Sequence, residues 1–497
     1  HEPEPRLCEK KSKMFFEETI NHASSLSGLP QDQLRFVFAA VAVVFFSPLV
    51  KKIPTDTGKH LVSIVVTCFL ITFCDSYRAI FHPAFTSLVV YFICRFGPKS
   101  KAHILVFVFS MTYMSLSHIY RMWNSYNSWD LDFTTAQMLI TVKFTIFGWN
   151  VYDGSRDEKT LSPYQKSVCL KTLPSLLEFL GYICFYPGWV AGPPFEYTVY
   201  NSFITGKMFD DKYCKGKAPS SFLQAMKTVA SAFVVVPFVL LAAYYPVSYT
   251  ITDAFAVLPA WKKLLYVYSL TLYRFKFYFA WGLADAACVA AGIAYNGYEE
   301  IDGKMYPKWN RVTPAYPMRV ELSTNTRDCT MYWNMVVANW LRRYVYERVA
   351  TNAKDTTKAT MATYAVSAFW HGFYPGYYLF FFYFGFMTEL AKDARRIFRP
   401  LIVPEDPRDE VPKLHSPQPL KAIYDVVTFL TTQLIGTYAG VGFMLLSWGN
   451  MMAFYHNTNY VGIIILLVAF FSFRFVLLPM TKRRARLATR PPTMKKE

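Results

Sequence analysis

Residues 363–382 read Thr-Tyr-Ala-Val-Ser-Ala-Phe-Trp-His-Gly-Phe-Tyr-Pro-Gly-Tyr-Tyr-Leu-Phe-Phe-Phe. They lie inside an apolar run, 361–390, which is long enough to cross a bilayer, since a spanning helix needs about 20 mostly apolar residues. Between Met361 and Met387 the one strongly ionisable side chain is that of His371. The stretch therefore predicts a membrane-embedded segment that carries a histidine.

Apolar runs of this kind recur along the whole chain. They occupy residues 36–50, 61–74, 84–96, 104–119, 137–151, 176–190, 229–245, 264–295, 426–446 and 460–478. Several are shorter than a full span and would form half-helices. The sequence predicts an all-α, polytopic membrane protein with about 10–11 transmembrane helices.

The composition agrees with a membrane protein. Of the 497 residues, 53% are hydrophobic and 17% are charged, and the mean hydropathy is +0.18. The net charge of +18 lies in the connections, as is typical of the cytoplasmic loops of membrane proteins, so no nucleic-acid partner is predicted. We expect a surface segment at 1–32, a membrane domain at 33–480 and a basic tail at 481–497.

Basic segments predict how the protein is oriented in the membrane, and the last residues predict which membrane holds it. Two apolar runs separate the basic loop 392–421 from the basic tail. Two spans return the chain to the same side of the membrane, so both segments are predicted to be cytosolic. The ending Met494-Lys-Lys-Glu is similar to a dilysine retrieval signal displaced by one position, which favours the endoplasmic reticulum membrane.

His371 is the first candidate for chemistry, because an ionisable residue inside a span is a functional candidate by default. Gly372, Pro375 and Gly376 are expected to break the helix directly after it and to leave room beside the ring. Histidine is the side chain best matched to proton transfer near pH 7. The alternative is a neutral histidine held by a hydrogen bond between helices.

Asn334 is the second candidate. Residues 332–349 follow helical spacing and predict one amphipathic helix. Asn334 and Asn339 would be about 140° apart on that helix, so they cannot share one small site, and Asn334 beside Trp333 is preferred. An amide can donate to a developing oxyanion without burying a charge; the alternative is an interhelical hydrogen bond.

Other motifs give weaker signals. Arg342, Lys354 and Lys358 form a basic patch suited to phosphates, or are ordinary loop charge. Asp285 could line a cavity or pair with Arg274. The sequence shows no metal-ligand spacing, Gly-rich phosphate loop or nucleophile elbow, so we expect no metal, no bound cofactor and no covalent intermediate.

Two segments are expected to surround a site. The run 176–190 is followed by Gly192-Pro-Pro and contains Pro187-Gly, and such breaks survive in a membrane only where protein or a cavity covers the backbone. This segment is therefore predicted to line a cavity. The polar stretch 296–330 has no apolar period and is interpreted as an ordered loop over the entrance to the site.

Several of these motifs resemble one family. Trp333-Asn-Met, followed by Ser367-Ala-Phe-Trp-His-Gly-Phe-Tyr-Pro-Gly-Tyr, resembles the paired Asn and His signature of the membrane-bound O-acyltransferase superfamily; the interval here is 371 − 334 = 37 residues. Similarity to its lysophospholipid acyltransferase branch, notably fungal and plant members, extends to Pro174-Ser-Leu-Leu-Glu, Gly192-Pro-Pro-Phe, Ala294-Tyr-Asn-Gly-Tyr-Glu and Trp340-Leu-Arg-Arg-Tyr-Val-Tyr-Glu-Arg.

The resemblance implies a bundle of helices around a central chamber, in which His371 and Asn334 transfer a fatty acyl group from acyl-CoA to the free, sn-2 hydroxyl of a lysophospholipid during phospholipid remodelling. Acyl-CoA would be a co-substrate whose phosphates meet the basic patch. The residues expected to line the chamber are Trp333, Trp370, Tyr374, Asn296 and Asp285. Val336-Val-Ala338 replaces polar residues of yeast-like members, so headgroup preference is not carried over.

Two alternatives are left open. A member of the same superfamily with diacylglycerol, a sterol or a peptide as acceptor would use the same two residues. A membrane transporter would also have broken helices and a buried histidine, but would release no CoA.

Overall fold

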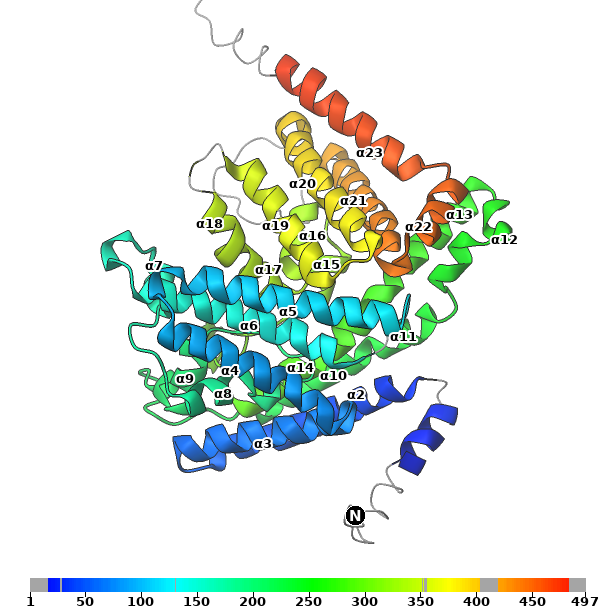
Figure 1. Ribbon diagram of the computed structural model, residues 1–497. Coiled ribbons are helices and arrows are strands. Elements are labelled where there is room, and N and C mark those ends of the chain that lie inside the picture. The colour runs from blue at the N-terminus through cyan, green and yellow to red at the C-terminus, as the bar shows by residue number, and fades with distance from the viewer. Residues whose placement is uncertain are drawn as a thin grey trace, which may run out of the picture. The chain divides into compact units, whose positions relative to one another are not determined.

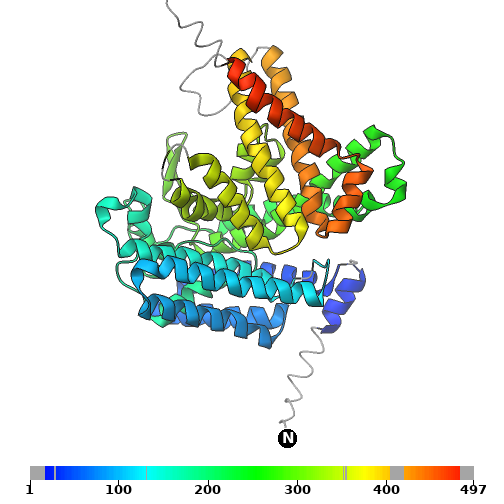
Figure 2. The same ribbon diagram turned by 45° about the horizontal axis from the view of Figure 1, so that its top comes forward.

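The computed structural model describes residues 17–26, 29–129, 131–350, 352, 355–402 and 419–481. These residues form two compact units. The first comprises the chain up to residue 236 together with 275–315, and the second comprises 237–274 together with the chain from 316. Both units are built almost entirely of helices (Figures 1 and 2).

The first unit contains long apolar helices joined by short 3-10 turns. Its elements are α2 (Gln31–Phe46), η1 (Ser47–Lys52), α3 (Asp56–Cys74), η2 (Tyr77–Ile80), α4 (Phe81–Phe96), η3 (Lys99–Lys101), α5 (Ala102–Asn124), α6 (Phe133–Gly154), η4 (Glu158–Thr160), α7 (Pro163–Val168), α8 (Leu176–Ile183), η5 (Tyr186–Gly188), α9 (Tyr197–Ile204), η6 (Lys207–Phe209), α10 (Phe222–Val234), α14 (Phe275–Ala291), β1 (Tyr298–Ile301) and β2 (Lys304–Pro307). The chain leaves this unit within α11 (Val236–Ala242).

The second unit contains the two segments that carry the predicted Asn and His. Its elements are η7 (Val247–Ile251), α12 (Asp253–Ala256), α13 (Ala260–Ser269), η8 (Leu270–Arg274), α15 (Pro317–Glu321), α16 (Thr326–Tyr332), α17 (Met335–Leu341), the π-helix η9 (Arg342–Tyr346), α18 (Glu347–Val349), α19 (Thr356–His371), α20 (Pro375–Ile402), α21 (Pro419–Leu445), α22 (Trp448–Asn457), α23 (Val461–Phe471) and the π-helix η11 (Ser472–Leu477).

Seven helical segments among the described residues are long and apolar enough to cross a membrane. They are Gln31–Lys52, Asp56–Cys74, Tyr77–Phe96, Lys99–Asn124, Phe222–Ile251, Pro419–Leu445 and Val461–Thr481. The four other predicted runs coincide with α6, with α8 and η5, with α13 to α14, and with α19 to α20. Breaks divide most of these: α8 ends after eight residues, η8 separates α13 from α14, and Gly372 follows α19. The expectation of half-helices is thus confirmed, and the described chain is a polytopic, all-α membrane protein.

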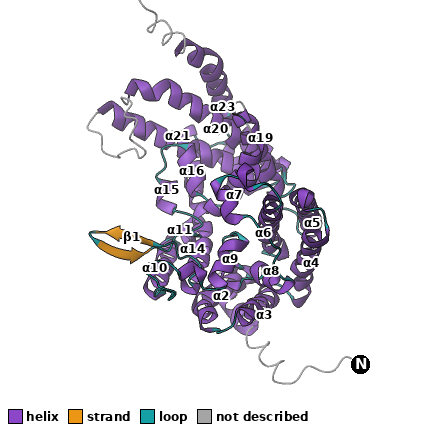
Figure 3. Ribbon diagram, turned by 90° about the vertical axis from the view of Figure 1, so that its left-hand side faces the viewer, coloured by secondary structure: helices purple, strands orange, loops and turns teal. Residues whose placement is uncertain are grey.

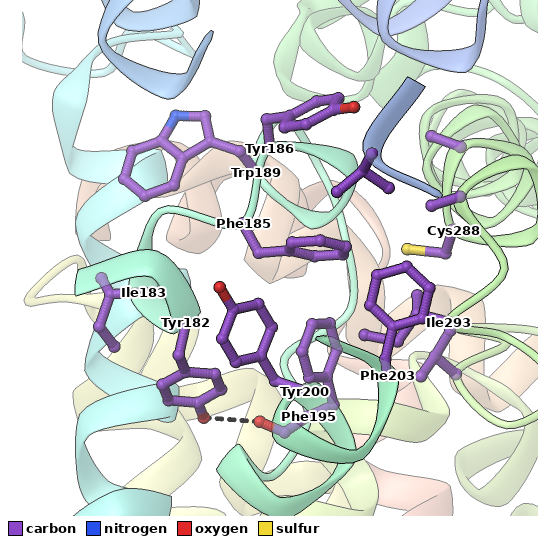
Figure 4. Packing of buried hydrophobic residues seen from close by; sticks show 14 of the residues in the cluster. Tyr182, Ile183, Phe185, Tyr186, Trp189, Phe195, Tyr200, Phe203, Cys288 and Ile293 are labelled. Atoms are coloured by element: carbon purple, nitrogen blue, oxygen red, sulfur yellow. Dashed lines mark hydrogen bonds between the residues drawn. The ribbon is translucent and has the colours of Figure 1, made fainter. Parts of the chain in front are cut away.

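The core of the first unit surrounds the break after α8. Tyr182, Phe185 and Tyr200 are buried there among other aromatic side chains, and the Tyr182 hydroxyl donates to the carbonyl of Phe195 at 2.6 Å (Figure 4). Lys143 of α6 is buried and donates to the carbonyls of Tyr182 and Ile183 at 3.1 and 3.2 Å. Its ammonium thereby satisfies carbonyls that the end of α8 leaves without helical partners.

The polar stretch 296–330 is not the loop that its sequence suggested. Tyr298–Ile301 and Lys304–Pro307 pair as an antiparallel hairpin, with Glu299 opposite Tyr306, and this is the one sheet among the described residues (Figure 3). Further along, α15 and α16 form short helices. The prediction failed because strands of four residues and helices of five and seven residues are too short to produce a recognisable period.

In the second unit, α20 packs against both α19 and α21. The buried side chains between them are mainly aromatic and aliphatic, including Tyr383, Met387 and Tyr438. The α20 and α21 helices run side by side in yellow and orange (Figures 1 and 2). Because α20 packs against both α19 and α21, the residues at the break between α19 and α20 are held in place relative to these helices.

Candidate active site

His371 is the last residue of α19. Gly372 ends the helix with φ +117° and ψ −160°, a conformation that is almost restricted to glycine. The chain turns there, and α20 begins at Pro375. The helix break predicted after His371 is therefore confirmed, and the imidazole is half-buried at the break.

One hydrogen bond sets the state of the imidazole. Nδ1 of His371 lies 2.7 Å from the carbonyl oxygen of Ser367. A carbonyl oxygen can only accept, so Nδ1 carries the hydrogen in this bond. In the neutral ring, Nε2 then has the lone pair that a base requires.

Aromatic rings of the described residues surround this imidazole. The ring centroids lie 4.6 Å away for Trp370, 4.9 Å for Phe381, 5.3 Å for Phe443 and 5.8 Å for Tyr377. Trp370 and Tyr377 are buried. An apolar wall of this kind limits access of water to the ring nitrogens.

Tyr374 was predicted to belong to the same wall. The side chain is buried, and its ring centroid lies 6.0 Å from that of Tyr377, which in turn neighbours His371. Phe381, Tyr377 and Phe443 were not among the predicted residues. Aromatic residues in an apolar run give no signal that distinguishes a site from ordinary packing.

A close contact between helices brings Phe443 to the imidazole. The Gly376 N–H donates to the carbonyl of Leu446 at 2.9 Å. A Cβ on Gly376 would lie 2.1 Å from the carbonyl oxygen of Gly442, so only glycine fits there. Phe443 follows Gly442 in α21, and its ring therefore faces the start of α20 and His371.

Asn334 lies outside the helix that was predicted for residues 332–349. The α16 helix ends at Tyr332, Trp333 is extended, and Asn334 has left-handed backbone angles, φ 38° and ψ 57°, before α17 begins at Met335. The prediction of one continuous helix was wrong, because apolar spacing persists across the break. Asparagine is among the few residues that tolerate this conformation.

The backbone supports the choice of Asn334 over Asn339. Asn334 is half-buried, whereas Asn339 is exposed. Strained backbone in a non-glycine residue is found often at functional sites. The chain beyond α17 continues into the π-helix η9, and π-helical turns are also frequent at such sites.

The helix that directly follows Asn334, α17, packs against α19, which ends in His371. The ring of Trp340 in α17 lies 6.0 Å from the ring of Trp370 in α19, and Trp340 is buried. His371 follows Trp370 directly. Asn334 lies six positions before Trp340, about 9 Å along the chain at the helical rise. The structure thus places both predicted residues in one unit, on two contacting segments.

The basic patch is only partly described. Arg342 is exposed and forms an ion pair with Glu347, with Nε and Oε1 3.1 Å apart. Lys358 is exposed near the start of α19. Lys354 lies outside the described residues, as do most of the basic tail and of the loop before α21.

Asp285 and Asn296 belong to the first unit, so their place in a chamber with His371 stays a prediction. Asp285 is buried in α14. The Asn296 amide donates to Asn310 at 2.9 Å, and its N–H donates to the carbonyl of Lys308 at the base of the hairpin. These bonds give Asn296 a structural role. Arg274, the suggested partner of Asp285, forms an ion pair with Glu321 at 2.6 Å.

The broken segment 176–190 does line a cavity. Trp189 and Val190 form part of the wall of a cavity of about 70 Å³ in the first unit. The backbone is tightly folded here, since a Cβ on Gly192 would lie 2.2 Å from the Cα of Gly188. Pro187 and Gly192, where the segment breaks, are not among the residues that line this cavity, so the prediction holds only for the end of the segment.

The chain was compared with known families and proteins. A model described as MBOAT, the membrane-bound O-acyltransferase family, matches residues 119–441 and includes both Asn334 and His371. The lysophospholipid acyltransferase of Schizosaccharomyces pombe is 34% identical over 459 residues, which are 90% of this chain and 88% of that protein.

Relatives from animals and plants are similar over the same extent. Human membrane-bound glycerophospholipid O-acyltransferase 2 is 30% identical over 93% of this chain and 87% of its own length. Lysophospholipid acyltransferase 1 of Arabidopsis thaliana is 29% identical over 87% of this chain and 91% of its own. With its helix break at the histidine, its two contacting candidate segments and these matches, the chain belongs to the membrane-bound O-acyltransferase family and is an acyltransferase.

Proposed function

We propose that the protein transfers a fatty acyl group from acyl-CoA to the free sn-2 hydroxyl of a lysophospholipid, with His371 as general base. The observation that carries the assignment of the base is the bond from Nδ1 to the Ser367 carbonyl, 2.7 Å long. It leaves Nε2 as the atom that can accept a proton. The fungal and plant relatives are named lysophospholipid acyltransferases, which supports a lysophospholipid as the acceptor.

The reaction is a direct transfer. The acceptor oxygen attacks the thioester carbonyl carbon while His371 Nε2 takes the hydroxyl proton. The bond between carbon and sulfur then breaks, and the departing thiolate of CoA receives the proton from the imidazolium. The products are the acylated phospholipid and free CoA, and the histidine returns to its neutral state.

Asn334 is proposed to stabilise the oxyanion of the tetrahedral intermediate through its amide N–H. The half-buried position of Asn334 and its left-handed backbone at the start of α17 support this assignment. Trp333, Trp370 and Tyr374 are proposed to exclude water, which would otherwise hydrolyse the thioester.

The acyl donor is proposed to approach from the cytosol. Its phosphates would meet Arg342, Lys354 and Lys358, since cations with several donors bind phosphates well. Asp285 and Asn296 are proposed to line the chamber. The protein would reside in the endoplasmic reticulum membrane with its basic C-terminal tail in the cytosol.

The test is CoA release by purified protein in detergent micelles, supplied with oleoyl-CoA and a panel of acceptors. The panel contains lysophospholipids with different headgroups, diacylglycerol and a sterol. We expect release that depends on a lysophospholipid and is abolished in His371→Ala. His456→Ala, which removes an exposed histidine at the end of α22, is the matched control and should remain active.

Each other outcome has a definite meaning. Release that depends on diacylglycerol or a sterol alone would replace the lysophospholipid by another acceptor of the same family. Equal activity of His371→Ala and His456→Ala would overturn the role of His371. No CoA release with any acceptor from folded protein would contradict the proposed reaction.

A further inference from the structure

Gln433 of α21 is a buried polar residue inside an apolar helix. It is 1% exposed, and its segment, Pro419–Leu445, is long and apolar enough to cross a membrane. A polar side chain in a span is costly unless it is hydrogen-bonded, and it often links one helix to another. The partners of Gln433 therefore indicate what the residue does.

The amide of Gln433 is hydrogen-bonded at both ends. Its Oε1 accepts from Nη2 of Arg274 at 2.9 Å, and its Nε2 donates to the carbonyl of Val320 at 3.0 Å and to Oγ of Ser323 at 3.2 Å. A guanidinium can only donate, so the bond from Arg274 fixes which end of the amide faces it. The N–H groups consequently point to the end of α15 and to the turn after it.

An ion pair extends this set of contacts. Nη2 of Arg274 also lies 2.6 Å from Oε2 of Glu321, and both side chains are largely buried. Arg274 ends η8 and Glu321 ends α15. Hydrogen bonds between charged groups are stronger than those between neutral ones. These contacts attach α15 to α21 and to η8.

The attached segment leads to Asn334. At the start of α15, the N–H of Tyr316 donates to the carbonyl of Tyr332 at 3.1 Å, and Nη1 of Arg319 donates to the Tyr332 hydroxyl at 2.7 Å. Tyr332 is the last residue of α16, which packs against α17 and α20 (Figure 1). Asn334 follows two positions later. The attachment of α15 therefore holds the chain at the point where Asn334 begins its left-handed turn.

The same helix, α21, also reaches His371. The ring of Phe443 lies 5.3 Å from the imidazole, and Gln433 and Phe443 are about 15 Å apart along α21 at the helical rise. One continuous helix thus contacts the segment that leads to Asn334 at one point and His371 at another. A change in the attachment of α15 to α21 would move Asn334 relative to the imidazole.

We propose that Gln433 is a positioning residue for the acyl transfer. With its amide oriented by Arg274, it fixes where Asn334 lies relative to His371. Misplacing a catalytic group by about 1 Å can lower the rate about 10²-fold. This inference rests on the proposed function, in which the Asn334 amide stabilises the oxyanion, so the effect of Gln433 on the rate passes through Asn334.

Gln433→Met tests the inference in the full chain in micelles. Methionine keeps the length and nearly the volume of glutamine but has no amide. We expect kcat for CoA release from oleoyl-CoA and a lysophospholipid to fall about tenfold or more. The KM of each substrate should change by less than about twofold, because the bound substrates are still held by the same groups. An unchanged kcat in folded Gln433→Met would overturn the inference.

A double-mutant cycle separates positioning from general support of the fold. In Asn334→Gly the amide to be positioned is absent, so adding Gln433→Met should lower kcat further by less than about twofold. Radiolabelled oleoyl-CoA measures the low rates of these variants. Equal fold-reductions with and without the Asn334 amide would show that Gln433 only supports the fold, and would overturn the inference.

Thr437→Val is the matched control. Thr437 is buried one turn further along α21, and its hydroxyl donates to the backbone carbonyl of Gln433 at 2.8 Å within the same helix. We expect its kcat to stay unchanged, and a loss equal to that of Gln433→Met would contradict a specific role of the Gln433 amide.

Ser323→Ala is the milder variant, which decides the question if Gln433→Met does not fold. It removes one acceptor of Nε2 and should lower kcat less than Gln433→Met does. The reduction should again be absent in Asn334→Gly, and a reduction that persists there would overturn the inference.

Failure of the proposed function gives a different result. An unmodified protein without lysophospholipid-dependent CoA release would overturn both the proposed reaction and this inference. An active unmodified protein, in which the effects of Gln433→Met and Asn334→Gly multiply, would overturn the inference alone.

Discussion

Nδ1 of His371 lies 2.7 Å from the carbonyl oxygen of Ser367, one turn earlier in α19. This bond joins the imidazole to the backbone of its own helix, whereas many catalytic histidines in other proteins are oriented by a carboxylate. A peptide carbonyl does not gain or lose a proton at any pH at which the protein is folded. The bond to Ser367 therefore favours the tautomer with hydrogen on Nδ1 without a titrating partner in that bond, and the rings of Trp370, Tyr377, Phe381 and Phe443 pack around the imidazole.

Replacing His371 by Gln tests the role of Nε2 as a base. The glutamine amide keeps hydrogen-bonding groups at the end of α19 but cannot accept a proton at neutral pH. We expect CoA release to fall by about 10²–10⁴-fold, the usual contribution of a general base. His456→Gln is the control. A His371→Gln enzyme with more than about a tenth of the original activity would contradict this role.

Gly372→Ala is expected to lower the free energy of unfolding. With φ +117° and ψ −160°, the residue has backbone angles that cost a non-glycine residue about 1–3 kcal/mol. Activity should fall as well, because the turn fixes the imidazole relative to α20. Gly449→Ala is the matched control: this glycine lies in α22 with open space around it, and alanine favours a helix by about 0.5–1 kcal/mol. Thermal unfolding of both variants measures the difference, and equal destabilisation would refute the explanation.

Two substitutions at Asn334 distinguish the contribution of its side-chain amide from that of its backbone conformation. Asn334→Gly removes the amide and fits the left-handed angles, so stability should be kept while CoA release falls. Asn334→Ala removes the amide and adds strain, so it should also lose about 1–2 kcal/mol of stability. Asn339→Ala, on the exposed side of α17, should change neither. Full activity of Asn334→Gly would show that only the backbone matters.

Local chemistry in the sequence was sufficient to predict the turn after His371, while the catalytic role of His371 stays a prediction. Gly372, Pro375 and Gly376 follow an ionisable residue in an apolar run, and this combination predicts a helix break directly after that residue. The break at Asn334 was not found, because Trp333, Val336 and Val337 keep helical spacing on either side of it. The spacing of apolar residues indicates which side chains are buried. A single residue with left-handed backbone angles hardly changes that spacing, so the spacing does not reveal the break.

The wall around the imidazole depends on tertiary packing. Phe443 reaches His371 because Gly376 lets α20 approach the carbonyl of Gly442. These positions are about 70 residues apart in the chain, so only the packing of two helices relates them.

The contact between Tyr295 and Asp211 predicts how stability depends on pH outside the membrane. The Tyr295 hydroxyl donates to the Asp211 carboxylate and holds the pKa of that carboxyl below its usual value of 3.8. A carboxyl whose pKa is lower in the folded state stabilises the fold above the unfolded pKa. This contribution is lost as the pH falls through the folded pKa.

Asp211→Asn should reveal that contribution. The amide oxygen can still accept from the N–H groups of Tyr213 and Cys214, as Asp211 does at 2.9 and 2.8 Å, so the turn itself is kept. We expect the variant to unfold at a lower temperature than the original protein above about pH 4, and the gap to narrow below that pH. Asp210→Asn changes the exposed neighbour and should show no such gap. A gap for Asp211→Asn that is constant down to about pH 2 would mean that the charge of Asp211 contributes nothing beyond its hydrogen bonds.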